Sequence, residues 1–317
     1  MKVTPYQEKD AAAWDEFVAT SRAATFLHTR KFLSYHGARF SDQSLLILDE
    51  KERLIGVFPA ALNPACEDMV VSHPGATFGG VVHAGKLRGE QAVWALDLIR
   101  QHYRALGLTH LRYKAIPHIY HTSPSQDDLY ALFRLGAVRY RCDLSCAIDL
   151  VARMSVSERR RRALKSARKQ GVEVFIGVEY AASIWSVLDE NLARKHNAKP
   201  VHTLQEILML HERFPNQIEF VAAMHADMAV AGVVLFHSPT LIHAQYIASS
   251  EAGYNLQALD ALFEWCIERA QQDGGARFFD FGISNENEGC VLNAGLYDFK
   301  AEFGGGGIVH EFFELAL

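Results

Sequence analysis

The spacing of apolar residues divides the chain into short strands and amphipathic helices. Apolar and aromatic runs bounded by turn residues predict strands, and apolar residues three or four positions apart predict helices. The strands are expected at residues 45–48, 54–58, 110–116, 218–224, 229–236, 241–247, 277–282 and 308–315. The helices are expected in two pieces within residues 3–37, and at residues 91–106, 127–135, 155–170, 185–194, 204–212, 256–271 and 291–303.

The second half of the chain repeats the order of elements in the first half. Leu129-Tyr130 and Leu296-Tyr297 occupy the same place in the two halves, at an offset of about 167 residues. Each half reads as helix, helix, hairpin, strand, helix, strand, helix, strand. We therefore predict two similar α+β domains, residues 1–150 and 151–317, each with a mixed, mostly antiparallel sheet flanked by helices. A cleft shared by the two domains is the expected binding site.

Composition narrows the class of protein. The 317 residues are 49% hydrophobic and carry a net charge of −5, which disfavours general affinity for nucleic acid or for a membrane surface. No run of about 18 apolar residues is present for a membrane span, and residues 1–5 lack a signal-type apolar core. The expected location is the cytoplasm. Five scattered cysteines predict reduced thiols, and no residue spacing indicates a metal site.

The most polar loop of the chain lies near its end. An aromatic strand, Phe278–Phe281, leads into the carboxylate- and amide-rich loop Asn285–Glu288. A helix is expected next, with Leu292, Leu296, Phe299 and Phe303 on its inner face and Tyr297 and Lys300 on its flank. A strand that ends in such a loop is a common way to build a site.

A strongly basic helix joins the two halves. Residues 155–170 read SVSERRRRALKSARKQ, with a serine cap and a weak apolar stripe. One interpretation is a solvated linker helix. The other is that several of its cations, Arg161 and Lys165 among them, bind a phosphorylated ligand, because guanidinium groups hold phosphates in bidentate fashion.

The motif Asn293-Ala294-x-x-Tyr297 followed by Phe303-Gly304, after a glycine-bearing hairpin, resembles the GNAT acyltransferase superfamily. The tandem plan with its basic helix resembles the double-GNAT branch, which includes Fem-type aminoacyltransferases and acyl-CoA-dependent N-acyltransferases of nucleotide-linked amino sugars. Three segments are similar to the sugar enzymes: residues 116–121, 196–203 and 286–296. The glycine-rich pyrophosphate loop usual in GNAT proteins is replaced by residues 249–257.

The resemblance implies roles for particular residues in acyl transfer to an amine. Tyr297 is the candidate acid for the coenzyme A sulfur, and Lys300 the candidate to assist the acyl carbonyl. Glu286 is the candidate to bind or deprotonate the amine. The identity of the general base stays open among Glu286, Glu288 and the histidines.

Substrate-binding residues are expected in several loops and on the basic helix. The candidates for the acceptor are His118, Tyr120, His121, His196, His202, Asn285, Glu288, Asn293, Arg161 and Lys165. The candidates for the acyl donor are Ala248, Tyr254, Asn255 and Gln257. Backbone amides at a helix N-terminus can hold a pyrophosphate without glycine.

The sequence thus favours an N-acyltransferase that moves an acyl group from acyl-CoA to a dTDP- or UDP-linked amino sugar for surface polysaccharide. No metal, no nucleic acid and no membrane span are expected, and a homodimer is the candidate assembly. Two alternatives stay open. One is a Fem-type enzyme that uses aminoacyl-tRNA on a peptidoglycan precursor, and the other is a non-catalytic binding protein with degenerate GNAT domains.

Overall fold

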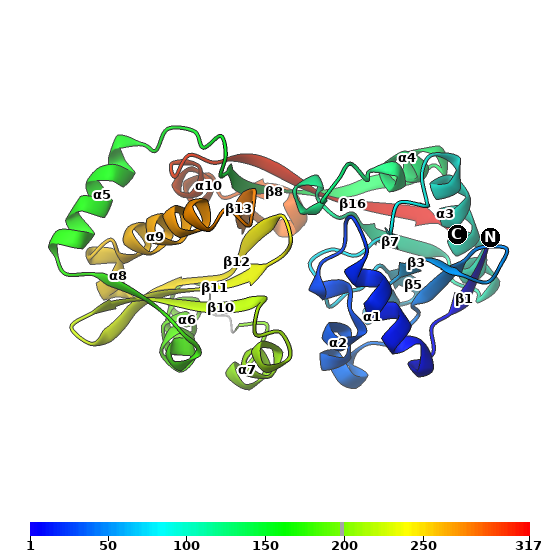
Figure 1. Ribbon diagram of the computed structural model, residues 1–317, viewed down its shortest axis with the longest axis horizontal. Coiled ribbons are helices and arrows are strands. Elements are labelled where there is room, and N and C mark those ends of the chain that lie inside the picture. Colours follow the sequence, from blue (N-terminus) through cyan, green and yellow to red (C-terminus); the bar gives the residue numbers. More distant parts are fainter. Residues whose placement is uncertain (197–199) are drawn as a thin grey trace. The chain divides into compact units, whose positions relative to one another are not determined.

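The chain folds into two compact α+β units, seen in a computed structural model that describes residues 1–196 and 200–317. Unit 1 comprises Met1–Asp143, Asn285–Val291 and Val309–Leu317, and unit 2 comprises Leu144–Ser284 and Leu292–Ile308. In each unit helices pack against β-strands (Figure 1). The α+β class expected from the sequence is confirmed. None of the helices in the described residues is both long and apolar enough to cross a membrane.

Unit 1 contains a four-stranded antiparallel sheet in the order β1-β2-β3-β6 and a second run of strands in the order β4-β5-β7-β16. The strands are β1 (Lys2–Pro5), β2 (Leu45–Leu48), β3 (Leu54–Phe58), β4 (Ala61–Asn63), β5 (Cys66–Val71), β6 (Val82–His83), β7 (His110–Lys114), β8 (Val138–Asp149) and β16 (Gly306–Ala316). The helices are α1 (Ala11–Ala19), α2 (Arg30–Leu33), α3 (Glu90–Ala105) and α4 (Asp127–Arg134). Short 3₁₀ turns lie at Glu8–Asp10, Phe26–His28, Ser34–Arg39, His118–Tyr120 and Asn287–Gly289.

Unit 2 is built on strands in the order β13-β12-β11-β10-β9, with β8 beside β13. All of these pairs are antiparallel except β12 with β13, which is parallel. The strands are β9 (Glu173–Ile176), β10 (Ile218–His225), β11 (Met228–His237), β12 (Leu241–Ser249) and β13 (Phe278–Ile283). The helices are α5 (Glu158–Lys169), α6 (Ala181–His196), α7 (Leu204–Arg213), α8 (Glu251–Asn255), α9 (Ala258–Asp273) and α10 (Ala294–Ala301), with a 3₁₀ turn at Val178–Tyr180. A separate pair of two-residue strands is β14 (Asn285–Glu286) and β15 (Val291–Leu292).

Two strands each contribute residues to both units. The second half of β8 pairs with β13 in unit 2, where Ile148 is the partner of Phe279. The end of β16 pairs with β7 in unit 1, where Phe313 is the partner of Tyr113. The strand that closes the first half of the sequence therefore completes unit 2, and the last strand of the chain completes unit 1.

The strands of unit 2 are covered by α9 on one face and α6 on the other (Figure 1). Side chains alternate between the faces, so Ala231 and Val233 belong to the core under α9. Gly232 between them faces α6, where a Cβ atom would lie 2.7 Å from the Ile184 side chain. The α9 core is mainly aliphatic but contains four phenylalanines, of which Phe263 and Phe281 are almost fully buried.

Most expected elements are present, with boundaries shifted by a few residues. Several expectations were wrong. Residues 2–5 form a strand rather than part of a helix, and no strand was expected at the residues of β4, β5, β8 or β9. The helix expected at 291–303 spans only Ala294–Ala301, because the Asn293 side chain accepts a hydrogen bond from the backbone N–H of Leu296 and so caps the helix. Within that helix, Leu296 is exposed and Lys300 is buried, which is the opposite of what was expected for these two residues.

Candidate functional site

The parallel pairing of β12 and β13 stops soon after it begins. The register runs from Leu241 with Phe278 to His243 with Asp280 and includes no later pair, although β12 continues to Ser249. Backbone groups on that side of β12 therefore have no partner strand over most of its length. Such a gap inside a sheet is a place where an extended ligand can add as a strand.

A buried carboxylate lies at the point where the two strands separate. Asp280 is fully buried, and its Oδ2 lies 2.7 Å from His243 Nδ1. Its Oδ1 accepts hydrogen bonds from the Ser145 hydroxyl and from the Gly282 backbone N–H, the latter at 3.1 Å. A carboxylate with several donors is stabilised in its ionised form.

The end of β13 pairs with β8, where Ile283 is the partner of Ser145, and side chains hold it as well. Lys300 of α10 donates from Nζ to the carbonyl of Gly282 at 2.8 Å and to that of Ile283 at 2.7 Å. The Asp280 carboxylate holds the N–H of Gly282, which has a φ of 77°. Burial lowers the pKa of Lys300 to about 8, opposed by the charge of Asp280. Both hydrogen-bonding groups of the Gly282 backbone are satisfied while the gap stays open.

His243 shares its face of the sheet with Tyr246. The register between β11 and β12 passes from Ala244 to Tyr246, so Gln245 is an extra, bulged residue that changes the alternation. Tyr246 packs against Trp185 of α6, and its hydroxyl hydrogen-bonds the Nδ1 of His202, which is buried. His202, a sequence candidate, therefore lies on the α6 face together with His243.

Tyr297 lies one turn before Lys300 on α10 and is partly exposed. Its pKa is raised, mainly by burial and secondarily by the nearby Cys146 thiol. Cys146 itself is buried, which raises its pKa to about 12 and keeps it protonated. Two of the three expected catalytic residues, Tyr297 and Lys300, thus belong to unit 2 with the Asp280 cluster.

A cavity of about 590 Å³ lies between the basic helix α5 and the start of α9. Its lining includes the guanidinium groups of Arg159, Arg160 and Arg162. Arg160 binds Asp260 at 2.6 Å, and both Arg159 and Arg160 bind Glu302. The lining also includes Ser166, Ser249, Gly253, Tyr254 and Gln257. We call it the arginine cavity.

The arginine cavity has unsatisfied capacity for a ligand. Arg162 forms no salt bridge with any described residue, and its Nε donates only to the Glu158 carbonyl, at 3.3 Å. Gln257 carries its backbone in the left-handed region, with a φ of 57°, directly before α9. The Oε1 atom of Gln257 is buried and has no hydrogen-bond partner in the described residues. A strained residue with an unsatisfied acceptor in a cationic cavity is typical of a binding site.

Other donor-side candidates have different surroundings. Ala248 is buried in β12 opposite Gly232, and Asn255 is exposed at the end of α8. Arg161 and Lys165 are exposed on α5 and do not line the arginine cavity, and Arg161 pairs with Glu158 at 2.8 Å.

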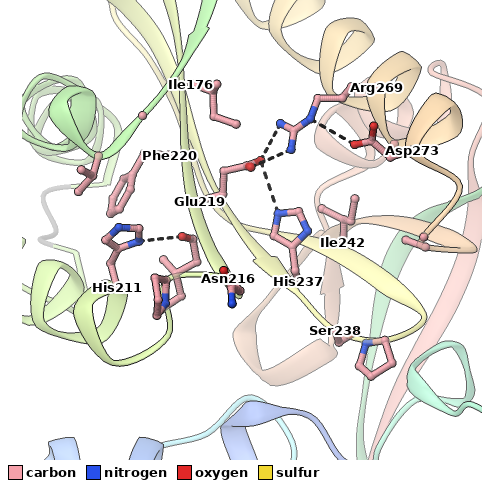
Figure 2. Close-up of a pocket in the computed structure, with 18 residues that line it drawn as sticks. Ile176, His211, Asn216, Glu219, Phe220, His237, Ser238, Ile242, Arg269 and Asp273 are labelled. Carbon is pink, nitrogen blue, oxygen red and sulfur yellow. Dashed lines mark hydrogen bonds and ion pairs between the residues drawn. The ribbon is translucent and has the colours of Figure 1, made fainter.

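A second cavity, of about 630 Å³, lies near the first residues of β12 (Figure 2). The arginine cavity lies near the last residues of the same strand. Arg269 points toward Glu219 and donates two hydrogen bonds to it, at 2.8 and 2.9 Å. His237 approaches the same carboxylate at 3.5 Å, and Asp273 lies 3.4 Å from Arg269. The charges of this cavity thus neutralise one another.

Several acceptor-side candidates belong to unit 1. His118 is exposed, Tyr120 is buried, and burial lowers the pKa of His121 to about 4. In the polar loop, Glu286 and Glu288 are exposed.

The amides of the same loop have local roles. Asn285 donates to the Gly289 carbonyl at 3.2 Å, which closes the loop, and Asn293 caps α10 in unit 2. The side chain of His196 lies outside the described part of the chain. No cluster of metal-ligating side chains is found in the described residues.

The sequence analysis missed His243, Asp280 and Ser145. The signal was present in the aromatic strand, because Asp280 stands between Phe279 and Phe281 in a run that is otherwise apolar. A carboxylate in a strand buried on both faces is rarely found without a partner. The partner, His243, is distant in sequence, so its position emerges only from the fold.

Comparison with known proteins found a family model that matches most of unit 2. Residues 152–300 match the family model described as an acetyltransferase (GNAT) domain. None of the curated proteins matches the chain. Among solved structures, FemX is 11% identical with a TM-score of 0.70, covering 100% of this chain and 98% of that one.

Two further structures share the fold over almost the whole chain. L-PGS from Bacillus licheniformis is 13% identical with a TM-score of 0.61, covering 98% of this chain and 92% of that one. A tandem GNAT protein from the clavulanic acid biosynthesis pathway is 11% identical with a TM-score of 0.52, covering 99% of this chain and 98% of that one. The chain has an α+β fold of two tandem GNAT-like domains.

Proposed function

We propose that the protein is an N-acyltransferase that takes its acyl group from acyl-CoA bound in unit 2. The arginine cavity is the observation that carries the proposal. Its guanidinium groups suit the diphosphate of coenzyme A, and the N-terminus of α9 adds a favourable dipole. The unsatisfied Gln257 Oε1 can accept a hydrogen bond from a ligand hydroxyl or amide.

The gap beside β12 supports an acyl donor with a pantetheine arm, such as coenzyme A. The segment of β12 between His243 and Ser249 is about 20 Å long, and Ser249 lines the arginine cavity. An extended pantetheine arm can follow this path, and its two amide groups can hydrogen-bond to backbone groups that no strand occupies. The thioester would then lie near the Asp280 cluster.

In this proposal Tyr297 supplies the proton to the coenzyme A sulfur, since it is partly exposed on the helix that also carries Lys300. Lys300 keeps the gap open by capping the end of β13. The proposed acceptor is the amine of a dTDP- or UDP-linked amino sugar, with Glu286 as the group that binds the ammonium. The acceptor rests on the sugar-type sequence segments.

Calorimetry with acetyl-CoA tests donor binding. The Arg162→Ala variant is expected to weaken binding about tenfold or more, because a charge-assisted hydrogen bond contributes about 1.5–3 kcal/mol. Arg161→Ala is the matched control, since Arg161 lies on the same helix but does not line the cavity. Equal effects of the two substitutions would contradict the assignment of the cavity.

Turnover is tested with acetyl-CoA and longer acyl-CoAs against a panel of dTDP- and UDP-amino sugars, with thiol release as the readout. Transfer to any member supports the proposal. Binding of acyl-CoA with no transfer to any amine would instead favour a non-catalytic GNAT protein.

Aminoacyl-tRNA is the second candidate donor. The whole-chain fold shared with FemX and the basic surface of α5 favour it. It predicts RNA binding that weakens steeply as salt is raised, because such binding releases counterions. Salt-sensitive retention of aminoacylated tRNA, with no affinity for acetyl-CoA, would replace the preferred donor.

A further inference from the structure

We propose that His243 is the general base of the acyl transfer and that Asp280 is its positioning residue. The proposal deepens the proposed function and rests on it. His243 is not among the histidines that were named as candidates from the sequence, which are His118, His121, His196 and His202. Three features of His243 support this role: the tautomer of its imidazole, the accessibility of its second ring nitrogen and its place beside the gap between β12 and β13.

The hydrogen bonds around Asp280 fix the tautomer of His243. The carboxylate accepts from the Ser145 hydroxyl, from the Gly282 N–H and from His243 Nδ1, the last at 2.7 Å. Burial disfavours the charged form of a carboxylate, but the three hydrogen bonds around Asp280 stabilise it as an acceptor. His243 must then carry its proton on Nδ1, which leaves the lone pair on Nε2.

The Nε2 atom of His243 is accessible. It forms no hydrogen bond with any described residue, and it is not among the buried side-chain atoms that lack a partner. The ring lies beside Gly282, where a Cβ atom would come within 3.3 Å of its Cε1 atom. Glycine at this position therefore leaves room next to the basic nitrogen.

Three other described histidines of unit 2 are less suited to this role. His202 is buried and bonded to the Tyr246 hydroxyl. His211 uses Nδ1 on the carbonyl of Ile218, and His237 faces a carboxylate that Arg269 already holds with two hydrogen bonds. Only His243, among these, joins a fully buried carboxylate to an accessible nitrogen.

The chemistry balances with this assignment. The amine nitrogen forms a bond to the acyl carbon, and the C–S bond of the thioester breaks with its electron pair leaving on sulfur. One N–H proton passes from the amine to His243 Nε2 and then to solvent. The sulfur takes a proton from Tyr297, and the resulting tyrosinate regains a proton from solvent. A positioned base of this kind contributes about 10² to 10⁴ in rate.

The kinetic test uses the full-length protein, acetyl-CoA and an amine accepted by the wild type. His243→Gln is expected to lower kcat by about 10² or more with the Kd for acetyl-CoA unchanged, and to remove the acid limb of the pH–rate profile. Asp280→Asn is expected to lower kcat and alter that limb. His225→Gln, at the far end of β10, is the control. An H243Q enzyme that keeps the wild-type kcat and pH profile would overturn the proposal.

A second measurement separates this inference from the proposed function. Long-range ¹H–¹⁵N spectra are expected to show the Nδ1–H tautomer for His243, and diethyl pyrocarbonate is expected to modify its Nε2. The opposite tautomer, or an unreactive His243, would overturn the inference even in an active enzyme. Absence of turnover with every amine would overturn the acyltransfer proposal and the role of His243 in it.

If Asp280→Asn fails to fold, Ser145→Ala replaces it. This variant removes one donor to the carboxylate and leaves the His243 contact in place. A positioning role predicts a shifted acid limb with little change in the urea midpoint. A lower midpoint with an unshifted limb would assign Asp280 and Ser145 a structural role only.

Discussion

The two units contain the same strand corner, and it is closed in unit 1 but open in unit 2. In unit 1 β5 pairs in parallel with β7, and the following loop continues the contact. Ser72 Oγ accepts from the Lys114 N–H at 2.8 Å, and the Gly79 N–H donates to the Lys114 carbonyl at 2.9 Å. In unit 2 the pairing of β12 with β13 includes nothing after His243 and Asp280.

A lysine supports each corner, with opposite results, and it is half-buried in unit 1 and buried in unit 2. Lys114 donates to two carbonyls of the loop at residues 73–79, which draws that loop into the gap. Lys300 donates to the carbonyls of Gly282 and Ile283, both at the end of β13. These hydrogen bonds lie on one side of the gap and draw no loop into it. A duplicated corner can thus become a packed support in one copy and a binding site in the other.

The largest expected effect comes from Gly79→Val, which should break the closed corner. A Cβ atom on Gly79 would lie 1.8 Å from the Ser72 carbonyl oxygen, which is backbone and cannot move aside. We expect a loss of about 4 kcal/mol or more in the free energy of unfolding of unit 1, measured by urea denaturation. Gly275→Val, at a position with open space around its Cβ, is the control. Equal urea midpoints for Gly79→Val and Gly275→Val would contradict the close approach of Gly79 to the Ser72 carbonyl.

Lys300→Met tests the cap of the open corner. It leaves two backbone carbonyls without their donor, at a cost of about 2–4 kcal/mol in the free energy of unfolding. Acetyl-CoA affinity should fall as well, since the end of β13 is no longer held. Lys165→Met on the exposed face of α5 should change neither quantity. A K300M protein as stable as wild type would show that the cap is dispensable.

Stability should rise with pH because of the lysine in the closed corner. Burial lowers the pKa of Lys114 from 10.5 to about 7, so between these values the unfolded chain binds more protons than the native one. The expected slope is at most about 1.4 kcal/mol per pH unit. Urea midpoints across this range measure it. Lys114→Met should reduce the slope, and an unchanged slope would count against the assignment.

Gln257→Gly should produce the smallest change in stability. Relief of the left-handed backbone is expected to stabilise the fold by about 1 kcal/mol, while loss of the buried Oε1 acceptor weakens acetyl-CoA binding. Thermal unfolding and calorimetry on one preparation separate the two effects. A variant that is more stable and binds acetyl-CoA normally would remove Gln257 from the donor site.

Most helices and strands could be predicted from the sequence because their signals come from residues close together in the chain. The periodicity of residues 258–273 and the serine cap before α5 depend on neighbours within a few positions. The site depends on distant partners. Asp280 and His243 come from different strands, and the buried Lys300 reads in sequence as a solvated residue. Spacing alone does not show that two backbone carbonyls can hold a lysine inside a protein.

The exchange of closing strands between the units sets an order for folding during synthesis. Arg112 of β7 and its partner Glu314 of β16 are 202 residues apart, so unit 1 stays incomplete until the last strand leaves the ribosome. Unit 2 takes its closing strand from β8, which is made earlier. A nascent chain therefore presents an unpaired β7 edge for most of its synthesis. Such an edge invites pairing with other chains, and slow, non-local closure prolongs that exposure.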